Sequence, residues 1–329
     1  MLPEIQNRFT SEILQACLET FGIEESTIQD LGGFESFIFG YSKDGQDAIL
    51  RIGHDRRRNR KLVLGEMEFL DYLAKAGADV CLPIQSPGRN WVETHPDGHG
   101  EAFVTSSFSK AQGRPPQPED WTAAFVEAYG VAVGKLHQLT QGFQPTPDYR
   151  RFDWDDPLML DTEASLPSSE GKVVEILHQT RGTIHSFPQC PSSFGLIHQD
   201  AHRGNFFVTE EGKFTFFDFD DCCYGHFAYD VAIVLFYAVA QEDSPEEYAG
   251  WFLKHFFQGY QRHNEFRAEW LSWLPAFLKL REIDIYGVIH RSRDVTQLEH
   301  PFEVAFMEGR KERIEAGKPF LNMDFRSLE

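Results

Sequence analysis

Hydrophobic and polar residues follow two different periods along the chain, and the change of period divides it into two parts. Residues 31–52 contain two runs rich in strand-forming side chains, FIFGY and AILRI, on either side of the turn sequence SKDGQD. Two further strands are predicted at Asn90–Thr94 and Glu101–Ser107. From Trp121 onward, the apolar residues recur mainly at helical spacing. The pattern therefore predicts a small β-rich part followed by a larger, mostly helical part.

The stretch AQGRPPQPED at 111–120 separates the two parts, because prolines and polar residues interrupt both periods there. We therefore expect an α+β organisation, with a first lobe at 1–108 and a helical second lobe at 109–329. Helices are predicted at 11–21, 62–75, 121–139, 172–187, 228–240, 245–262, 268–290 with an interruption at Pro275, and 301–316.

One helix of the first lobe carries a charged residue on its apolar side. Glu66 falls on the stripe of the helix at 62–75, and a carboxylate that faces inward needs a cationic partner. Arg51 is the nearest candidate in the strand behind it, and the alternative is that Glu66 reaches solvent from the edge of the stripe. The basic run RRRNRK at 56–61 is interpreted as a solvated loop, with contact to phosphate or to an acidic partner as the alternative.

The segment at 195–222, GLIHQDAHRGNFFVTEEGKFTFFDFDDC, concentrates the polar residues of interest. Two short runs around Glu-Glu-Gly predict a β-hairpin, which would bring Asp218 back beside Asn205. A carboxylate and an amide oxygen are hard ligands suited to Mg²⁺. Asp200 remains available for a substrate proton, a division of roles that phosphoryl transfer requires. Asp220 either assists the metal or faces solvent.

Composition and charge narrow the class of protein. A chain of 329 residues is longer than a single hydrophobic core usually supports, which favours two lobes or domains. The hydrophobic content of 41% supports a folded chain. A net charge of −20 argues against nucleic-acid or anionic-membrane partners, and the apolar runs are too short to span a bilayer. Five cysteines without a CxxC pair fit a reducing compartment. These features predict a soluble cytoplasmic protein, with no prediction of its oligomeric state.

Several other catalytic signatures are absent from the sequence: GxxxxGK[ST], HExxH and GxSxG. An alternative is a His/carboxylate metal site for hydrolysis, formed by His198 and His202 with the nearby aspartates.

The form HQDAHRGN, followed by a hairpin and an aspartate, resembles the catalytic segment of the aminoglycoside phosphotransferase and choline kinase branch of the protein-kinase-like enzymes. Other segments are similar to this family in the same order along most of the chain. LGGFESFIF resembles the loop that covers the nucleotide phosphates, AILRI the strand with the phosphate-pairing residue, and GEMEFLDYL the helix with its partner glutamate. VTSSF falls at the adenine hinge, GVAVGKLH at the helix before the catalytic loop, and YDVA at its brace.

The resemblance implies a two-lobed kinase-like fold and a role for each matching residue. Asp200 would be the catalytic base, and Asn205 and Asp218 would hold Mg²⁺. The residues implied in ATP binding are Gly32, Gly33, Arg51, Glu66, Thr105 and Ser107. His198, His202 and Asp230 would support the catalytic loop. Arg51 stands where the family often has lysine, and its planar head changes the geometry expected around the nucleotide.

The function implied is ATP- and Mg²⁺-dependent phosphorylation of a hydroxyl on a small molecule: an aminoglycoside, choline, homoserine or a similar amino alcohol. Candidate acceptor contacts are the acidic stretch Asp153–Asp156 and, in the late helices, Trp270, Arg281 and Tyr286. Two alternatives share the same motifs, namely a Ser/Thr protein kinase of the bacterial stress-response type and a catalytically silent nucleotide-binding module.

Overall fold

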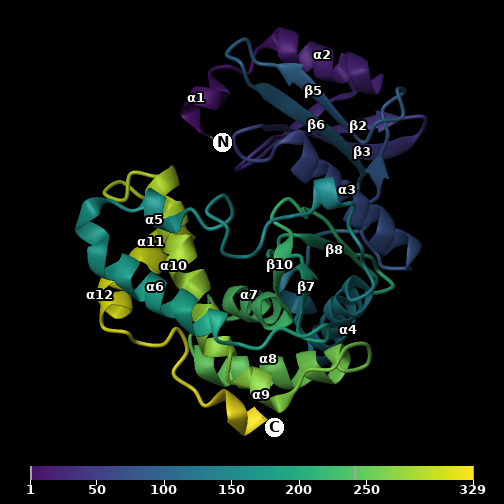
Figure 1. Ribbon diagram of the computed structural model, residues 1–329. Helices are drawn as coiled ribbons and strands as arrows, with labels where there is room; N and C mark the ends of the chain where they lie inside the picture. Colours follow the sequence, from purple (N-terminus) through teal and green to yellow (C-terminus); the bar gives the residue numbers. More distant parts are fainter. Residues whose placement is uncertain (1, 241, 329) are drawn as a thin grey trace. The chain divides into compact units, whose positions relative to one another are not determined.

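The computed structural model describes residues 2–240 and 242–328, and these divide into two compact units (Figure 1). The first unit runs to Arg114 and also includes Gly142–Arg151 and Phe206–Asp220. The second unit contains Pro115–Gln141, Phe152–Asn205 and the chain from Asp221 onward. The first unit therefore extends beyond the boundary expected after residue 108 and recruits two later segments.

The first unit is built on an antiparallel sheet with the strand order β1-β2-β3-β6-β4, and β5 also pairs with β6 (Figure 1). The strands are β1 Gln29–Gly32, β2 Phe37–Lys43, β3 Gln46–His54, β4 Pro83–Ile84, β5 Val92–Pro96 and β6 Ala102–Ser109. The short helix α1 Pro3–Gln6 and helix α2 Ser11–Phe21 contribute apolar side chains to a core with the sheet. In that core Leu18, Leu50 and Phe103 are fully buried.

Helix α3 Arg60–Lys75 begins at Asn59, whose side chain accepts a hydrogen bond from the Leu62 amide and caps the helix. The predicted hairpin is present as β8 Phe206–Val208 and β9 Phe214–Phe216, and Gly212 adopts the positive φ of 78° that its turn requires. The hairpin belongs to the first unit because its strands bond the backbone next to Val80 and at Arg114.

The second unit is mostly helical and contains one two-stranded sheet, β7 Phe194–Ile197 with β10 Cys223–His226. Its helices are α4 Ala123–Thr140, α5 Thr162–Ser165, α6 Gly171–His185, α7 Phe227–Val239, α8 Pro245–Tyr260, α9 Ala268–Leu271, α10 Leu274–Ser292, α11 Pro301–Met307 and α12 Arg310–Glu315. Helix α7 lies in the core of this unit and is almost entirely buried, as its uniformly apolar sequence predicts. Helix α10 packs against it and carries several buried charges.

The predicted helices are found within a few residues of their expected ends. The interruption expected at Pro275 is confirmed, because α9 ends at Leu271 and α10 begins at Leu274 with the proline in its first turn. The prediction of one continuous helix over 301–316 is wrong. The segment is divided into α11 and α12 at Gly309, which adopts a left-handed φ of 61°.

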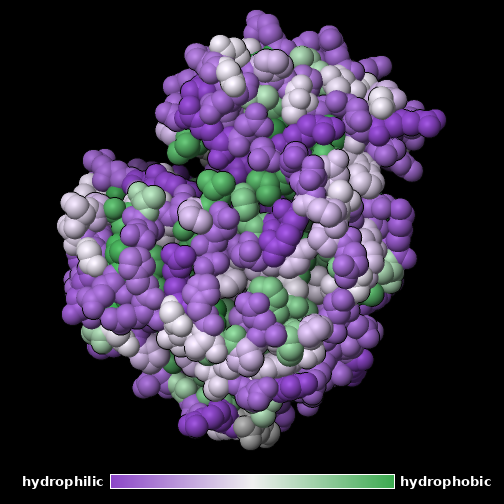
Figure 2. Space-filling view, in the orientation of Figure 1, coloured by the Kyte–Doolittle hydropathy of each residue, from purple (hydrophilic) through white to green (hydrophobic). Residues whose placement is uncertain are grey.

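The visible faces of both units are mainly hydrophilic, with smaller hydrophobic areas between the polar ones (Figure 2). Among the described residues, no helix has the length and apolar character needed to cross a membrane.

Candidate active site

The predicted catalytic loop follows β7 in the second unit, and Asp230 of α7 holds its backbone. The Asp230 carboxylate accepts hydrogen bonds from the amides of His198 at 2.9 Å and Gln199 at 2.6 Å. Gln199 adopts a positive φ of 65°, a conformation that costs free energy outside glycine. The two bonds therefore hold a strained turn directly before Asp200, which is consistent with the supporting role that the family resemblance implied for Asp230.

A buried histidine that the sequence analysis did not single out completes this brace. His137 of α4 places Nε2 at 3.0 Å from the Asp230 carboxylate, and its Nδ1 lies 2.7 Å from the Tyr260 hydroxyl. All three side chains are buried. The only signal for it in the sequence is weak, a histidine at the end of an apolar helical stripe. Three helices, α4, α7 and α8, thus converge on the catalytic loop.

The Asp200 carboxylate is engaged at both of its oxygens. Arg281 of α10 donates from Nη2 to Oδ1 at 2.6 Å, and Asn205 donates from Nδ2 to Oδ2 at 2.8 Å. His202 lies 3.3 Å from Oδ2. Partial burial raises the pKa of Asp200, but the opposite charges on His202 and Arg281 outweigh it, so the net pKa lies below its usual value. Asp200 is therefore ionised at neutral pH.

Arg281 belongs to a small network that connects α10 with α7. The same Nη2 donates to the Tyr237 hydroxyl at 2.8 Å, and Nη1 donates to Asp284 at 3.1 Å. The guanidinium also lies 5.3 Å from the centre of the Tyr237 ring. Burial raises the pKa of Tyr237 to about 12, so its hydroxyl is neutral. The sequence indicated Arg281 as an acceptor contact, and its position against Asp200 was not foreseen.

The other two late-helix candidates lie in packed surroundings. Trp270 is 1% exposed and lies in an aromatic cluster with Phe266 and Trp273. Tyr286 donates its hydroxyl hydrogen to Glu170 at 3.1 Å. Both contacts are those of core residues.

Two residues carry the oxygens expected to bind a metal, one in each unit. Asn205 uses its amide nitrogen on Asp200, and its side-chain oxygen has no hydrogen bond recorded within the described chain. Asp218 lies two residues after the end of the hairpin and has a positive φ of 62°. An amide oxygen and a carboxylate are the donor types that Mg²⁺ and Ca²⁺ accept, so the residues present fit a hard divalent cation.

In the first unit, the predicted ion pair between Arg51 and Glu66 is confirmed. Arg51 donates from both terminal nitrogens to the two Glu66 oxygens, at 2.9 and 2.5 Å, and both residues are buried. Burial alone would lower the pKa of Arg51. The negative charges of Glu66 and Asp220 raise it by more than burial lowers it, so the net pKa lies above its usual value and the guanidinium stays charged. Glu66 does not reach solvent. Of the two alternatives that its helical periodicity left open, the ion pair with Arg51 is therefore the correct one.

The basic run at 56–61 is only partly solvated, because its middle residues, Arg57 and Arg58, are less exposed than the residues on either side and bond an acidic residue. Arg57 donates to the Asp220 carboxylate at 3.0 Å, and Arg58 donates to the Asp220 carbonyl oxygen at 3.1 Å. Arg151 donates to the same carbonyl at 2.5 Å. Burial raises the pKa of Asp220, but these arginines and Arg51 reverse the effect and lower it. Asp220 is thus held by arginines, two residues from Asp218.

A pocket of about 300 Å³ in the first unit has mostly apolar walls. Its charged lining residues are Arg51, Lys110 and Asp218, and its apolar ones include Leu31, Ile49, Leu70 and Phe108. This is the composition of a site for a flat base carrying a charged tail.

The structure does not bring every predicted nucleotide contact to this pocket. Thr105 donates to Cys17 of α2, and Ser107 donates to the Ile49 carbonyl of the neighbouring strand β3. The following residues, 108–111, line the pocket instead. The assignment of Thr105 and Ser107 to nucleotide binding stays a prediction. Gly33, at the start of the covering loop, is constrained, because a Cβ there would meet the Ser36 carbonyl at 2.0 Å.

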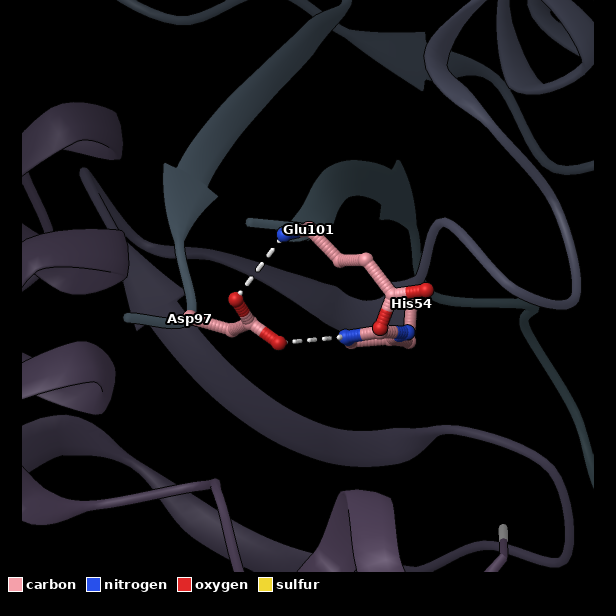
Figure 3. A group of neighbouring side chains, drawn as sticks. All are labelled: His54, Asp97 and Glu101. Atoms are coloured by element: carbon pink, nitrogen blue, oxygen red, sulfur yellow. Dashed lines mark hydrogen bonds and ion pairs between the residues drawn. The ribbon is translucent and has the colours of Figure 1, made fainter. Parts of the chain in front are cut away.

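A second group of polar side chains in this unit has the composition of a metal site. His54, Asp97 and Glu101 converge at the ends of β3, β5 and β6 (Figure 3). Arg8 already bonds Asp97 at 2.7 Å and Glu101 at 2.8 Å, and Arg56 bonds Glu101 at 2.9 Å. Two arginines thus balance the two carboxylates, so the group is interpreted as a structural ion-pair cluster.

An α+β chain with a braced HxDxxxxN loop, an Arg–Glu pair and an aspartate after a hairpin defines a kinase-like phosphotransferase. A sequence model of the Phosphotransferase enzyme family matches residues 27–270, and the chain belongs to this family. The chain is 32% identical over 322 residues to the amicoumacin kinase of Bacillus subtilis (strain 168), covering 96% of this chain and 95% of that one.

Solved structures agree with this assignment. The complex of amicoumacin kinase hAmiN with AMP-PNP, Ca²⁺ and Ami superimposes with a TM-score of 0.94 and 31% identity, over 100% of both chains. A microcompartment-associated aminopropanol kinase shares the fold, with a TM-score of 0.74 at 18% identity, over 94% of this chain and 98% of that one. The predicted family and kinase-like fold are confirmed, and the chain is a kinase-type phosphotransferase.

Proposed function

We propose that this protein transfers the γ-phosphate of ATP to a hydroxyl group of amicoumacin or of a molecule similar to it. The observation that carries the proposal is the Asp200 carboxylate, held ionised between Arg281 and Asn205 on a braced loop. Similarity to amicoumacin kinases along nearly the whole of both chains supports the choice of acceptor.

Asp200 is the proposed catalytic base. As the acceptor oxygen forms its bond to the γ-phosphorus, the acceptor proton passes to an Asp200 oxygen and the bond from phosphorus to the ADP oxygen breaks. Because the pKa of Asp200 is low, its main contribution is to orient the hydroxyl and to receive the proton late. Arg281 and Asn205 fix the direction of the carboxylate, and His202 adds a further contact.

The first unit supplies the proposed nucleotide contacts. Arg51, kept charged and directed by Glu66, is suited to the phosphates, and the apolar pocket beside it is suited to the adenine. We infer that residues 109–111 supply the backbone contacts to the base, because they line this pocket. Gly32 and Gly33 allow the covering loop to approach the phosphates closely.

Asn205 and Asp218 are the residues proposed to hold a divalent cation. A divalent cation held by these residues would supply positive charge that offsets the negative charge developing on the phosphates during transfer. The AMP-PNP and Ca²⁺ bound to the similar kinase support nucleotide and divalent-cation use here.

The test is a transfer assay with purified full-length protein, Mg²⁺ and γ-labelled ATP. The acceptor panel consists of amicoumacin, kanamycin, 1-amino-2-propanol, choline and homoserine, with a whole-cell lysate as a source of protein acceptors. We expect label on amicoumacin or another small member, and loss of at least a hundredfold in kcat for Asp200→Asn. Label found only on lysate proteins would contradict the small-molecule assignment and favour a protein kinase.

Nucleotide binding is measured separately by calorimetry. Asp200→Asn should bind Mg-ATP as the wild type does, since Asp200 is not a proposed nucleotide contact. Failure of the wild type to bind any nucleotide in the presence of Mg²⁺ would refute the proposed function altogether.

A further inference from the structure

Arg57 connects two segments of the first unit that are far apart in the sequence. Its Nε donates to a carboxylate oxygen of Asp220 at 3.0 Å, and its Nη1 lies 3.6 Å from Oε1 of Glu35. Glu35 belongs to the loop between β1 and β2, residues 33–36, which is the covering loop. Asp220 lies two residues beyond Asp218, which is proposed to hold the cation. We call Glu35, Arg57 and Asp220 the Arg57 bridge.

The side chains of the Arg57 bridge are mostly withdrawn from solvent. Their exposed fractions are 22% for Glu35, 24% for Arg57 and 13% for Asp220. Charges in such surroundings need a partner, and here one cation stands between two carboxylates. Because solvent screens these pairs less than pairs on an open surface, breaking either of them should have a measurable effect.

Two cavities of the first unit have Arg51 as a common wall. The pocket of about 300 Å³ is lined by Arg51 and Asp218, whereas a cavity of about 10 Å³ is lined by Arg51, Arg57 and Asp220. Ser36 of the covering loop also lines the smaller cavity. A cavity of this size holds one water molecule at most and has no room for a phosphate group. Arg57 and Asp220 therefore lie behind the residues that are proposed to contact the nucleotide.

Asp220 is held at its backbone as well as at its carboxylate. Arg58 donates to its carbonyl oxygen at 3.1 Å, and Nη1 of Arg51 lies 3.7 Å from its Oδ1. Asp218, two residues earlier, has a left-handed φ of 62°, a conformation that costs free energy outside glycine. A strained residue keeps its position only if its neighbours are fixed, so the contacts of Asp220 also support Asp218.

We propose that Arg57 is a positioning residue for the nucleotide phosphates, which ties the covering loop to the segment of Asp218 so that both are in place before a triphosphate binds. The proposal rests on the proposed function and specifies how the first unit prepares its phosphate site. Without the bridge, the triphosphate must itself order the loop and the segment, which weakens its binding. The base does not contact the bridge, so the effect is confined to ligands that carry phosphates.

The experiment measures binding by calorimetry on the purified full-length protein. One ligand is Mg-AMP-PNP, and the other is adenosine, which has no phosphate. Glu35→Gln should weaken binding of Mg-AMP-PNP by about threefold to fivefold, the range of a partly exposed ion pair. Arg57→Gln should weaken it by about threefold to tenfold, because Asp220 loses a partner as well. Both variants should bind adenosine within about twofold of the wild type.

Two variants serve as matched controls, and both should bind the two ligands as the wild type does. Asp44→Asn removes an exposed carboxylate at the turn between β2 and β3, and it is the control for Glu35→Gln. Arg56→Gln removes the neighbouring arginine, whose partners are Glu4 and Glu101, and it is the control for Arg57→Gln.

The double variant Glu35→Gln/Arg57→Gln tests whether the two residues act through each other. It should bind Mg-AMP-PNP as weakly as Arg57→Gln alone, because Glu35 has already lost its partner there. Arg57→Lys keeps the charge without the forked head and should restore part of the affinity. Thermal unfolding is recorded for every variant. Glu35→Gln changes only a loop and should unfold at the wild-type temperature, so it decides the question even if Arg57→Gln does not fold.

Three results would overturn the role of Arg57: effects that multiply in the double variant, equal weakening of adenosine and Mg-AMP-PNP, or bridge variants that behave like their controls. Each of these results requires a wild type that binds nucleotide. If the wild type binds neither ligand, the proposed function itself fails.

Discussion

Replacing Arg281 with methionine should change the ionisation of Asp200 rather than only the stability of the protein. The two side chains meet at 2.6 Å, and methionine keeps much of the arginine's apolar length while removing its charge. At an effective dielectric constant of about 20, unit charges about 4 Å apart attract by about 4 kcal/mol, which corresponds to about three pKa units. The Asp200 side chain is 22% exposed, so solvent screening reduces the expected rise to about one or two units.

The sign of the effect follows from the direction of the shift. In the folded protein the pKa of Asp200 is depressed, so its ionisation stabilises the fold above the unfolded pKa of about 3.9. That stabilisation is lost as the pH falls through the folded pKa. Without Arg281 the folded pKa rises, and the loss therefore begins at higher pH.

The assay is thermal unfolding from pH 2 to 7, a range that covers the expected rise in the pKa of Asp200, together with the pH dependence of kcat/KM for the acceptor wherever the protein stays folded. In Arg281→Met the acidic limb should move to higher pH, and Arg281→Lys should restore part of the shift because it keeps the charge. Asp284→Asn is the control, since it contacts Arg281 and not Asp200. An acidic limb that stays in place while kcat falls in proportion to the folded fraction would refute the positioning role.

Three further predictions concern the supports of the site. Asp230→Ala should lower the free energy of unfolding by about 3–5 kcal/mol in denaturant titration, because two loop amides and His137 lose a buried charged partner; a loss below 1 kcal/mol would contradict the brace. Arg57→Gln should raise the KM for Mg-ATP by about threefold to tenfold, because Asp220 loses one of the arginines that hold it. Arg56→Gln is the control, since the partners of Arg56 are Glu4 and Glu101, and it should leave this KM unchanged. Equal effects of the two substitutions would exclude a specific role for Arg57. Arg51→Lys should retain measurable transfer and lose about 1–3 kcal/mol of stability, because one of two bonds to Glu66 is lost; full stability would show that the bidentate pair contributes little.

The sequence predicted those parts of the fold that depend on local pattern. Helix 11–21, the hairpin after Phe206 and the break before Pro275 each follow from apolar spacing, a glycine turn or a proline, and each is present. The pairing of Arg51 with Glu66 was also accessible, because a carboxylate on an apolar stripe requires a cation. The division of the helix at 301–316 could not be predicted in the same way. No proline or second turn residue stands beside Gly309 in the sequence, and its left-handed φ is seen only in the structure.

The contacts that could not be predicted are those made between distant segments. Arg281 reaches Asp200 across 81 positions of sequence, and His137 reaches Asp230 across 93. His137 ends the segment GVAVGKLH, which indicated a helix before the catalytic loop but not the contact that the histidine makes, and Arg281 lies outside the motifs quoted above. A buried arginine or histidine on a helix satisfies the same apolar period as a core residue. Both became visible once packing placed their helices beside the loop.

In the structure, charged residues that the sequence suggested for ligand binding are already paired with other residues of the chain. A net charge of −20 and the acidic stretch at 153–156 invited the idea of an acidic acceptor site, yet Asp155 is already paired with His185 at 2.8 Å. The same holds for the basic run, whose arginines bond Asp220 and Glu101 rather than free phosphate. Since a side chain held in an ion pair must give up that partner before it can bind a ligand, charge counts alone overestimate the available binding groups.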